Sequence, residues 1–359
     1  MPFPMDYIIY FSPVLMVFIA LILRIKAINY TVVVFLVLFI GLRGAGGDII
    51  GYTNYYNASN FVSDIAERGL SSDKSTIKYS IEFFYSFINS FSKSLGGGLT
   101  LVFFTTSLFF TFLIYHASIK FNKLNPYIFF TFFIVTSYMP LGMHYVRQGL
   151  AVAFLSLAIA YYNSPKKRLL AIILALGSHI VSGIVGLVLV YVMGMKRKSL
   201  IVLMAAPFLA LLLNKEILDL ISFVFVSSDS TMLQRYPERF GNSRGISSLD
   251  KVLVILTMVN FIYLSYKKKP DLMVGRFMAT AIFYLVFIVF SSNVDVFSRY
   301  FTLLYPFLLY FSYEALVVYV KQKRLILIIH LFLAFLIFFR FVNDSRIQEL
   351  FFPFKFFLE

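Results

Sequence analysis

The chain alternates between long apolar runs and short polar connections along its whole length. Helices that rise 1.5 Å per residue need about 17 to 25 apolar residues to cross a hydrocarbon core of about 30 Å. The runs are continuous rather than alternating, which favours helices over the strands of a barrel. The pattern predicts an all-α polytopic membrane protein with about twelve transmembrane segments. These are 7–23, 30–42, 99–119, 126–142, 149–163, 169–177, 180–193, 200–213, 251–266, 277–292, 300–320 and 325–342.

The apolar run from 169 to 193 has basic residues at both ends, 166–168 before it and 196–198 after it. Both ends should therefore face the same side, and the run must enter the membrane and return. Its polar break is Gly177-Ser178-His179, which leaves arms too short for a full crossing. We expect a short hairpin near 169–193 with His179 at its tip, in a cavity rather than against lipid.

Composition agrees with a membrane location, and the distribution of charge predicts how the protein is oriented across the membrane. Of the 359 residues, 60% are apolar and 14% charged, unlike a soluble globule, and the net charge is +15. Six short connections carry 17 basic residues and one acid, Asp271, whereas the rest of the chain holds 15 basic and 16 acidic residues. This asymmetry predicts cytoplasmic loops, so nucleic acid is not needed to explain it. Twelve crossings then place both termini outside.

Two outer segments, 43–98 and 214–250, are much longer than the cytoplasmic loops. With no internal repeat and no low-complexity stretch, we expect a single transmembrane domain over 1–359. Within 43–98, apolar residues recur at helical spacing, which predicts a helix lying along the outer membrane surface, with Ser72 and Asp73 at its start. The apolar positions of this helix are Ile77, Ile81, Phe84, Ile88 and Phe91.

Arg43, Arg147 and Arg299 stand at outer helix ends, where basic residues are usually depleted. Arginine presents a planar fork that engages two phosphate oxygens, so a shared pyrophosphate would explain all three. Anchoring to lipid headgroups is the alternative for any one of them. The carboxylates Asp48 and Asp295 nearby argue against simple anchors, although they could also hold the arginines in place.

Other chemistries find less support. Cysteine is absent and the four histidines have no metal-ligand spacing, so we expect no metal site. The Gly-rich stretch 41–48 lacks the Lys-Ser/Thr ending of a P-loop, which argues against nucleotide binding. Glu314 and His330 lie at similar depth and could form a structural pair, with proton transfer as the rarer interpretation.

Several short motifs, taken in order, resemble the EpsG family of Wzy-type polysaccharide polymerases over about residues 40–305. The sequence departs from the family pattern in having Gly46-Gly47-Asp48-Ile49 where Gly-Thr-Asp-Thr is common, and in lacking a small residue after Glu82. The motifs are Arg43 with Gly47-Asp48 and Tyr52, Tyr79-x-x-Glu82-x-x-Tyr85, Arg147-Gln148, His179 in GSHIVSG, and Arg299-Tyr300.

The resemblance implies a glycosyltransferase C-like bundle in the bacterial inner membrane, with its active site on the periplasmic side. Such an enzyme joins oligosaccharide repeat units carried on undecaprenyl pyrophosphate into O-antigen or a related surface polysaccharide. Its partners would be the lipid-linked donor and acceptor, membrane lipids and a chain-length regulator. It would use no cofactor.

These expectations give roles to individual residues. Arg147, assisted by Arg43 and Arg299, would bind the departing pyrophosphate, and Asp48 or His179 would act as general base. The remaining residues would orient the substrate or guide the polymer: Tyr52, Glu82, His144, Gln148, Arg235, Arg239 and Tyr300.

Two other functions stay open from the sequence. One is a lipid-linked oligosaccharide flippase or other transporter, although transporters commonly show repeats and bind near the midplane. The other is an O-antigen ligase, which would share the pyrophosphate chemistry and differ in its acceptor.

Overall fold

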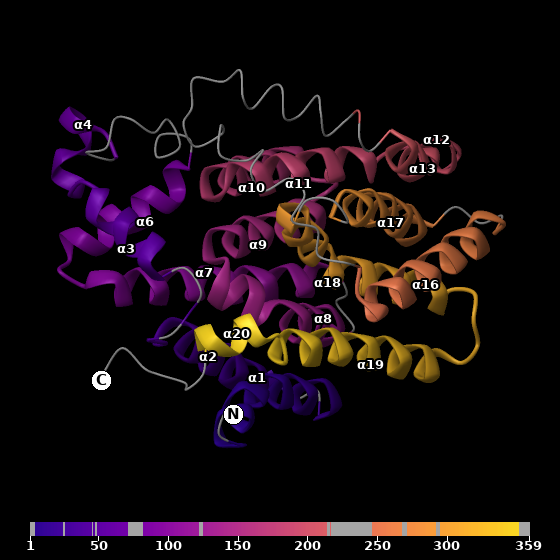
Figure 1. Ribbon diagram of the computed structural model, residues 1–359, viewed down its shortest axis with the longest axis horizontal. Coiled ribbons are helices and arrows are strands. Elements are labelled where there is room, and N and C mark those ends of the chain that lie inside the picture. The colour runs from indigo at the N-terminus through magenta and orange to yellow at the C-terminus, as the bar shows by residue number, and fades with distance from the viewer. Residues whose placement is uncertain are drawn as a thin grey trace. The chain divides into compact units, whose positions relative to one another are not determined.

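The computed structural model describes residues 4–23, 26–44, 46, 49–70, 82–121, 125–213, 216, 246–267, 271–291 and 295–351. All regular elements within these ranges are helices (Figure 1). They form two compact units, the first made of Met1–Val190 and Ala334–Glu359 and the second of Tyr191–Leu333. The expected single transmembrane domain stays a prediction.

The first unit is built around α9, which packs against α7 on one side and α10 on the other, while α2 packs against α7. Figure 1 shows α7, α9 and α10 as successive layers, with α3, α4 and α6 gathered at one end of them. The helices of this unit are α1(Pro4–Leu23), α2(Lys26–Gly41), α3(Ile49–Ala58), η1(Val62–Asp64), α4(Ile65–Arg68), α6(Phe83–Ser94), α7(Gly98–Phe121), α8(Tyr127–Ser137), η2(Tyr138–His144), α9(Val146–Ala160), α10(Pro165–Ser178), α11(Ile180–Val192) and α20(Ser345–Phe351).

The segment 127–144, formed by α8 and η2, is buried along its whole length. Pro140 has no backbone N–H, which removes one donor from the helical ladder. The N–H of Tyr145 instead donates to the carbonyl of Pro140, five residues back, at 2.8 Å. This bond closes a widened π turn, and such turns often occur at functional sites. The chain leaves helical geometry at Tyr145, and α9 begins at Val146.

The chain bends sharply between α10 and α11, at the residue where we expected the hairpin tip. His179 has extended backbone angles. A Cβ on Gly183 would lie 2.6 Å from the Cα of Leu176, whereas positions seven apart in one continuous helix are separated by about 10 Å. Gly183 thus lets α11 turn back directly against the end of α10.

The second unit packs α17 most extensively against α18, with α13, α16 and α12 also on α17. Arg197 holds the end of α16 by donating to the carbonyls of Leu264 and Lys267, and Ser247 caps its start by accepting from the amide of Asp250. Its helices are α12(Arg197–Leu203), α13(Ala205–Leu212), α16(Ser248–Ser265), α17(Leu272–Ser291) and α18(Asp295–Val317), followed by the first part of α19(Lys323–Val342), which returns to the first unit.

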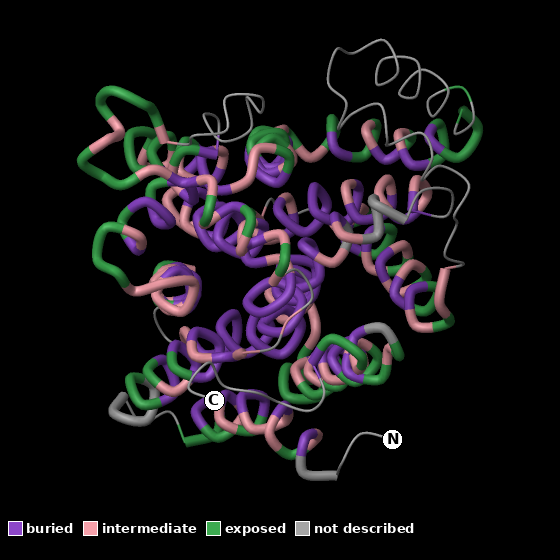
Figure 2. Tube along the Cα trace, turned by 60° about the vertical axis from the view of Figure 1, so that its left-hand side comes forward, coloured by how far each residue is buried: buried purple, intermediate pink, exposed green. Residues whose placement is uncertain are grey.

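Among the described residues, six helices are long and apolar enough to cross a membrane, and four shorter apolar helices accompany them. Many helices carry buried and exposed positions side by side (Figure 2), as expected for helices with one face on protein and one on lipid. The protein is an all-helical, multi-pass membrane protein. Each predicted segment overlaps a helix, although 126–142 is divided between α8 and η2 and 200–213 between α12 and α13. The count of twelve stays a prediction.

The outer segment 43–98 is helical, as expected, and α6 overlaps the surface helix that we predicted there. Its described part holds three α-helices, α3, α4 and α6, and the short helix η1. On α6, Ile88 is buried as predicted, but Phe91 is exposed and the polar Asn89 is buried instead. The buried face is rotated because α6 packs its polar residues against α3 and α7 rather than only against a lipid surface. Ser72, Asp73, Ile77 and Ile81 lie outside the described residues.

Candidate functional site

The centre of the candidate site is a buried ion pair between Arg147 and Glu82. Arg147 is the second residue of α9, directly after the π turn, and Glu82 immediately precedes α6. Nη1 of Arg147 lies 2.6 Å from Oε2 of Glu82, and the two side chains are 15% and 1% exposed. A buried carboxylate of this kind is tolerated only when it is paired.

Two tyrosines surround this ion pair. The hydroxyl of Tyr55 donates to the same Oε2 of Glu82 at 3.2 Å. The guanidinium carbon of Arg147 lies 5.0 Å from the ring centre of Tyr55 and 5.9 Å from that of Tyr85, within the range of cation–π attraction. Burial and the nearby carboxylate of Glu82 raise the pKa of Tyr55 above its usual value. Its hydroxyl therefore keeps its proton and stays a donor.

Most donors of Arg147 have no partner among the described residues. A guanidinium has five N–H donors, and only Nη1 of Arg147 makes a hydrogen bond to a described residue. Nη2 and Nε are left to bind another acceptor. The positive charge of Arg147 is held in place by Glu82 and two aromatic rings, while part of its fork remains available to an anion.

Arg43 lies at the same end of the first unit as Arg147, but its side chain has different partners. It is 1% exposed, and its Nη atoms donate to the backbone carbonyls of Ile40 and Met143, the latter at 2.9 Å. Its guanidinium carbon lies 4.4 Å from the ring centre of Phe103. Burial lowers the pKa of Arg43 to about 10, so it remains charged at neutral pH. Arg43 thus fastens the end of α2 to the π turn.

Contacts between rings connect the two arginines. Phe103, which Arg43 covers, meets the ring of Tyr52 edge-on at 5.6 Å, and Tyr52 lies 6.1 Å from Tyr85 next to Arg147. These three aromatic residues belong to one buried cluster that also includes Tyr55 and residues of α9. The cluster makes the positions of both guanidinium groups depend on the same packing.

Tyr52 holds the break between η2 and α9. Its hydroxyl donates to the carbonyl of His144 at 3.2 Å and accepts from the amide of Val146 at 2.9 Å. Gly149 allows the two segments to meet, because a Cβ at this position would lie 2.0 Å from the carbonyl oxygen of Leu141. Together these contacts set the direction in which Arg147 leaves the backbone.

Two buried acceptors near Arg147 have no partner among the described residues. They are Oε1 of Glu82 and Oε1 of Gln148, on side chains that are almost fully buried. Buried polar atoms are normally hydrogen-bonded, so each exception calls for an explanation. Sugar hydroxyls are donors that would satisfy such acceptors.

His179 lies on the same side of the first unit as Glu82. Gly177, two residues before it, packs so closely on the ring of Phe83 that a Cβ there would lie 2.4 Å from that ring. Nδ1 of His179 accepts from the amide of Ser182 at 3.2 Å and so caps α11. Neutral His179 therefore carries its proton on Nε2, as a donor.

The remaining predicted site residues are placed as follows. His144 is buried at the end of the π turn, with its ring centre 6.1 Å from that of Phe351. Arg299 and Tyr300 are on α18 in the second unit, and their convergence with the arginines of the first unit stays a prediction. Asp48, Tyr79, Arg235 and Arg239 lie outside the described residues.

Sequence reasoning did not single out Tyr55 and Phe103. Tyr55 follows Tyr52 by three positions on the same short helix, a spacing that places both on one face and could have indicated a shared contact. Phe103 carries no such signal, since it is one of 44 phenylalanines in an apolar run. No group of three or more metal-ligating side chains lies in the part of the chain that the structure describes.

The comparisons with known proteins identify the family. The family model of the EpsG family matches residues 26–356. No curated protein and no solved structure matches the chain significantly. Since the match covers nearly the whole chain, the protein belongs to the EpsG family, a family of Wzy-type polymerase-like membrane proteins.

Proposed function

We propose that the protein is a membrane glycosyltransferase that polymerises oligosaccharide repeat units carried on undecaprenyl pyrophosphate into O-antigen or a related surface polysaccharide. Membership of the EpsG family supports the general role of a membrane polysaccharide polymerase. The donor glycan is transferred from the lipid pyrophosphate to a sugar hydroxyl of the acceptor chain.

The observation that carries this proposal is the half-engaged guanidinium of Arg147. It is oriented by Glu82, Tyr55 and Tyr85, and within the described part of the chain no residue occupies its Nη2 or Nε. A fixed positive fork of this kind suits a pyrophosphate whose negative charge grows as it departs. Preorganisation matters because the fork need not rearrange while the bond breaks.

In the proposed reaction, a hydroxyl oxygen of the acceptor sugar attacks the anomeric carbon of the donor. The bond between that carbon and the pyrophosphate oxygen breaks, and undecaprenyl pyrophosphate leaves with the bonding electron pair. The hydroxyl proton passes to a base. Oε1 of Glu82 and Oε1 of Gln148 would accept hydrogen bonds from hydroxyl groups of the bound sugars and so orient them.

Of the two base candidates, His179 is the less suitable. The lone pair on Nδ1 of His179 is already engaged with the amide of Ser182, so its Nε2 offers a proton instead of accepting one. We assign His179 to donating a hydrogen bond to the substrate, and Asp48 to receiving the proton.

The other predicted residues take supporting parts. Arg43 positions the turn that carries Arg147, because both of its Nη atoms bind backbone carbonyls. His144 is the last residue of that turn, and Tyr52 on α3 holds it by donating to its carbonyl. Arg299 keeps its proposed role in binding pyrophosphate and Tyr300 its proposed role in binding substrate, and Arg235 and Arg239 would guide the growing polymer.

The proposed location follows from the charge asymmetry of the loops. The basic connections face the cytoplasm, so the end of the first unit that carries Glu82 and Arg147 opens to the periplasm of a bacterial inner membrane. Both partners, the lipid-linked donor and acceptor, reach it through the outer leaflet. A chain-length regulator is a further proposed partner, and no cofactor takes part.

Reconstitution of the purified chain with one defined lipid-linked repeat unit tests the proposal. Formation of a polymer ladder is the expected result. Movement of the substrate across the bilayer without new bonds would instead identify a flippase, and product only after addition of lipid A core would identify a ligase. Either of these two results would overturn the polymerase assignment.

A further inference from the structure

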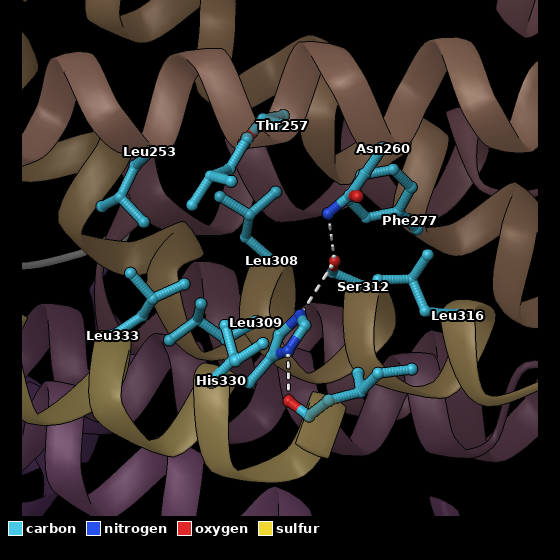
Figure 3. Close-up of a pocket in the computed structure, with 13 residues that line it drawn as sticks. Leu253, Thr257, Asn260, Phe277, Leu308, Leu309, Ser312, Leu316, His330 and Leu333 are labelled. Carbon is cyan, nitrogen blue, oxygen red and sulfur yellow. Dashed lines mark hydrogen bonds between the residues drawn. The ribbon is translucent and has the colours of Figure 1, made fainter. Parts of the chain in front are cut away.

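The second unit contains a cavity of about 200 Å³ that is far from Glu82 and Arg147 in the sequence and is used by no step proposed above. It lies among α16, α17, α18 and α19, and all of its lining residues belong to the second unit. Figure 3 shows leucine side chains pointing into it from several helices. Apart from Thr257, its polar lining consists of three side chains joined in one hydrogen-bonded chain, Asn260, Ser312 and His330.

The carbonyl oxygen of Ile326, at the end of this row of hydrogen bonds, determines which group donates in each of them. Nδ1 of His330 lies 2.8 Å from the carbonyl oxygen of Ile326, which can only accept, so Nδ1 carries the proton. Nε2 of neutral His330 then accepts from the hydroxyl of Ser312 at 3.1 Å. Because Ser312 has used its proton, its oxygen accepts from Nδ2 of Asn260, also at 3.1 Å.

These donor and acceptor roles determine the orientation of the Asn260 carboxamide. Distances alone would not distinguish its oxygen from its nitrogen. Nδ2 faces Ser312, as Figure 3 shows, and Oδ1 is left without a partner among the described residues. The free polar atom of the Asn260 carboxamide is therefore an acceptor. It is held in that orientation by helices α18 and α19, through Ser312 and His330.

Size and lining define the rest of the ligand. An apolar cavity of about 150 Å³ stays dry and takes up a molecule of the size of benzene, so this cavity has room for a slightly larger apolar group. Drug-sized ligands occupy pockets of about 300 Å³ or more, so only part of a long molecule would enter. A purely hydrocarbon ligand would leave Oδ1 of Asn260 unsatisfied, whereas a ligand with one donor would satisfy it.

We propose that this cavity binds a membrane-resident lipid alcohol, with part of its hydrocarbon body among the leucines and its hydroxyl donating to Oδ1 of Asn260. The bilayer is the source of such molecules, since α16, α17 and α19 are all long and apolar enough to span it. The site goes beyond the proposed polymerase function, which does not depend on it.

Positions along the helices indicate the leaflet from which the alcohol enters. Asn260 is seven residues before Lys267, and His330 is six after Arg324. At 1.5 Å per residue, both lie about 10 Å from helix ends that carry basic residues. With basic ends facing the cytoplasm, the ligand would come from the inner leaflet.

The test uses the full chain in proteoliposomes and two photoreactive probes. One is a long-chain alcohol with a diazirine in its chain, and the other is the methyl ether of the same molecule, which has no donor. After irradiation, labelled peptides are identified by mass spectrometry. We expect the alcohol to label peptides of α16, α18 and α19 about fivefold more than the ether does, the effect of one neutral hydrogen bond.

Two variants separate the hydrogen bond from mere occupancy of the cavity. Asn260→Leu should bring labelling by the two probes to the same level. Ser312→Ala removes the group that orients the carboxamide, so the preference for the alcohol should fall even though Asn260 is present. The matched control Ile255→Leu, on the exposed side of α16, should keep the full preference.

Equal labelling of the unaltered protein by both probes would overturn the proposal. So would a preference for the alcohol that persists in Asn260→Leu, or labelling confined to peptides outside the lining. Polymer synthesis can be measured in the same vesicles, so a loss of the polymerase assignment and a loss of the alcohol site are recognised separately.

Discussion

Glu82 and Arg147 are 65 residues apart in the chain, yet Oε2 of Glu82 lies 2.6 Å from Nη1 of Arg147. The contact joins the residue before α6 to the first turn of α9 and is covered by two tyrosine rings. In a site this buried, removing one partner leaves the other charge uncompensated, at a cost of about 3–5 kcal/mol. The ion pair is therefore both a structural contact and the support of the proposed anion site.

Arg147→Ala should abolish long polysaccharide ladders while the protein still inserts into the membrane. Loss of a preorganised electrostatic contact to the departing group usually costs about 10²- to 10³-fold in rate. Ladder length in a strain without its own copy of the gene measures the effect. Ladders of normal length from a well-expressed variant would refute the role of Arg147.

Exchange of the pair, Glu82→Arg together with Arg147→Glu, separates stability from function. Each single change should lower the yield of folded protein because it places like charges together. The double variant should recover most of the yield because the ion pair is restored. It should not polymerise, because the guanidinium is then carried by position 82 instead of position 147. Thermal unfolding in detergent and ladder assays report the two effects. Full activity of the double variant would show that polymerisation requires the ion pair but not an arginine at position 147.

Tyr55→Phe should lower polymerisation by about tenfold or less, since it removes one hydrogen bond to Glu82 and keeps the ring beneath Arg147. The pKa of Tyr55 is raised by burial and by Glu82, so the protonated form persists to a pH above its ordinary value. The ratio of wild-type to variant activity should therefore stay constant from about pH 6 to about pH 9. A ratio that collapses within this range would contradict the role of the hydroxyl as a constant donor.

Arg43→Lys should act mainly on stability. The lysine keeps the charge but has no fork, so it cannot serve the carbonyls of both Ile40 and Met143. One buried carbonyl left unpaired costs about 1–3 kcal/mol. A lower midpoint of thermal unfolding in detergent is expected. An unchanged midpoint with complete loss of polymer would instead indicate that Arg43 contacts substrate.

Gly149→Ala should disturb the join between η2 and α9, because its Cβ would meet the carbonyl of Leu141. The backbone would have to shift, and overpacking of this kind costs about 1–3 kcal/mol or more. Gly275→Ala is the matched control, since no atom lies within 4 Å of a Cβ at that position. Unfolding midpoints should fall for the first and stay unchanged for the second. Equal midpoints would show that the close approach is not needed.

Much of the helical architecture was predictable, because in a membrane each spanning segment must satisfy its own backbone hydrogen bonds. Every predicted segment therefore falls on a helix, and the bend at His179 occurs at the polar break of its apolar run. The outer segment was less predictable. On α6 the exposed Phe91 and the buried Asn89 reverse the order that hydrophobicity suggests, because a neighbouring helix decides which face is covered.

By itself, the sequence determined the helical class, the positions of the apolar segments and the chemical types of the site residues. Only the tertiary structure decided that one Nη atom of Arg147 pairs with Glu82, that both Nη atoms of Arg43 donate to backbone carbonyls, and that Tyr55 joins Glu82. Two arginines look alike in a sequence, since each has the same charge and donors. Their difference arises from partners that packing brings from distant parts of the chain.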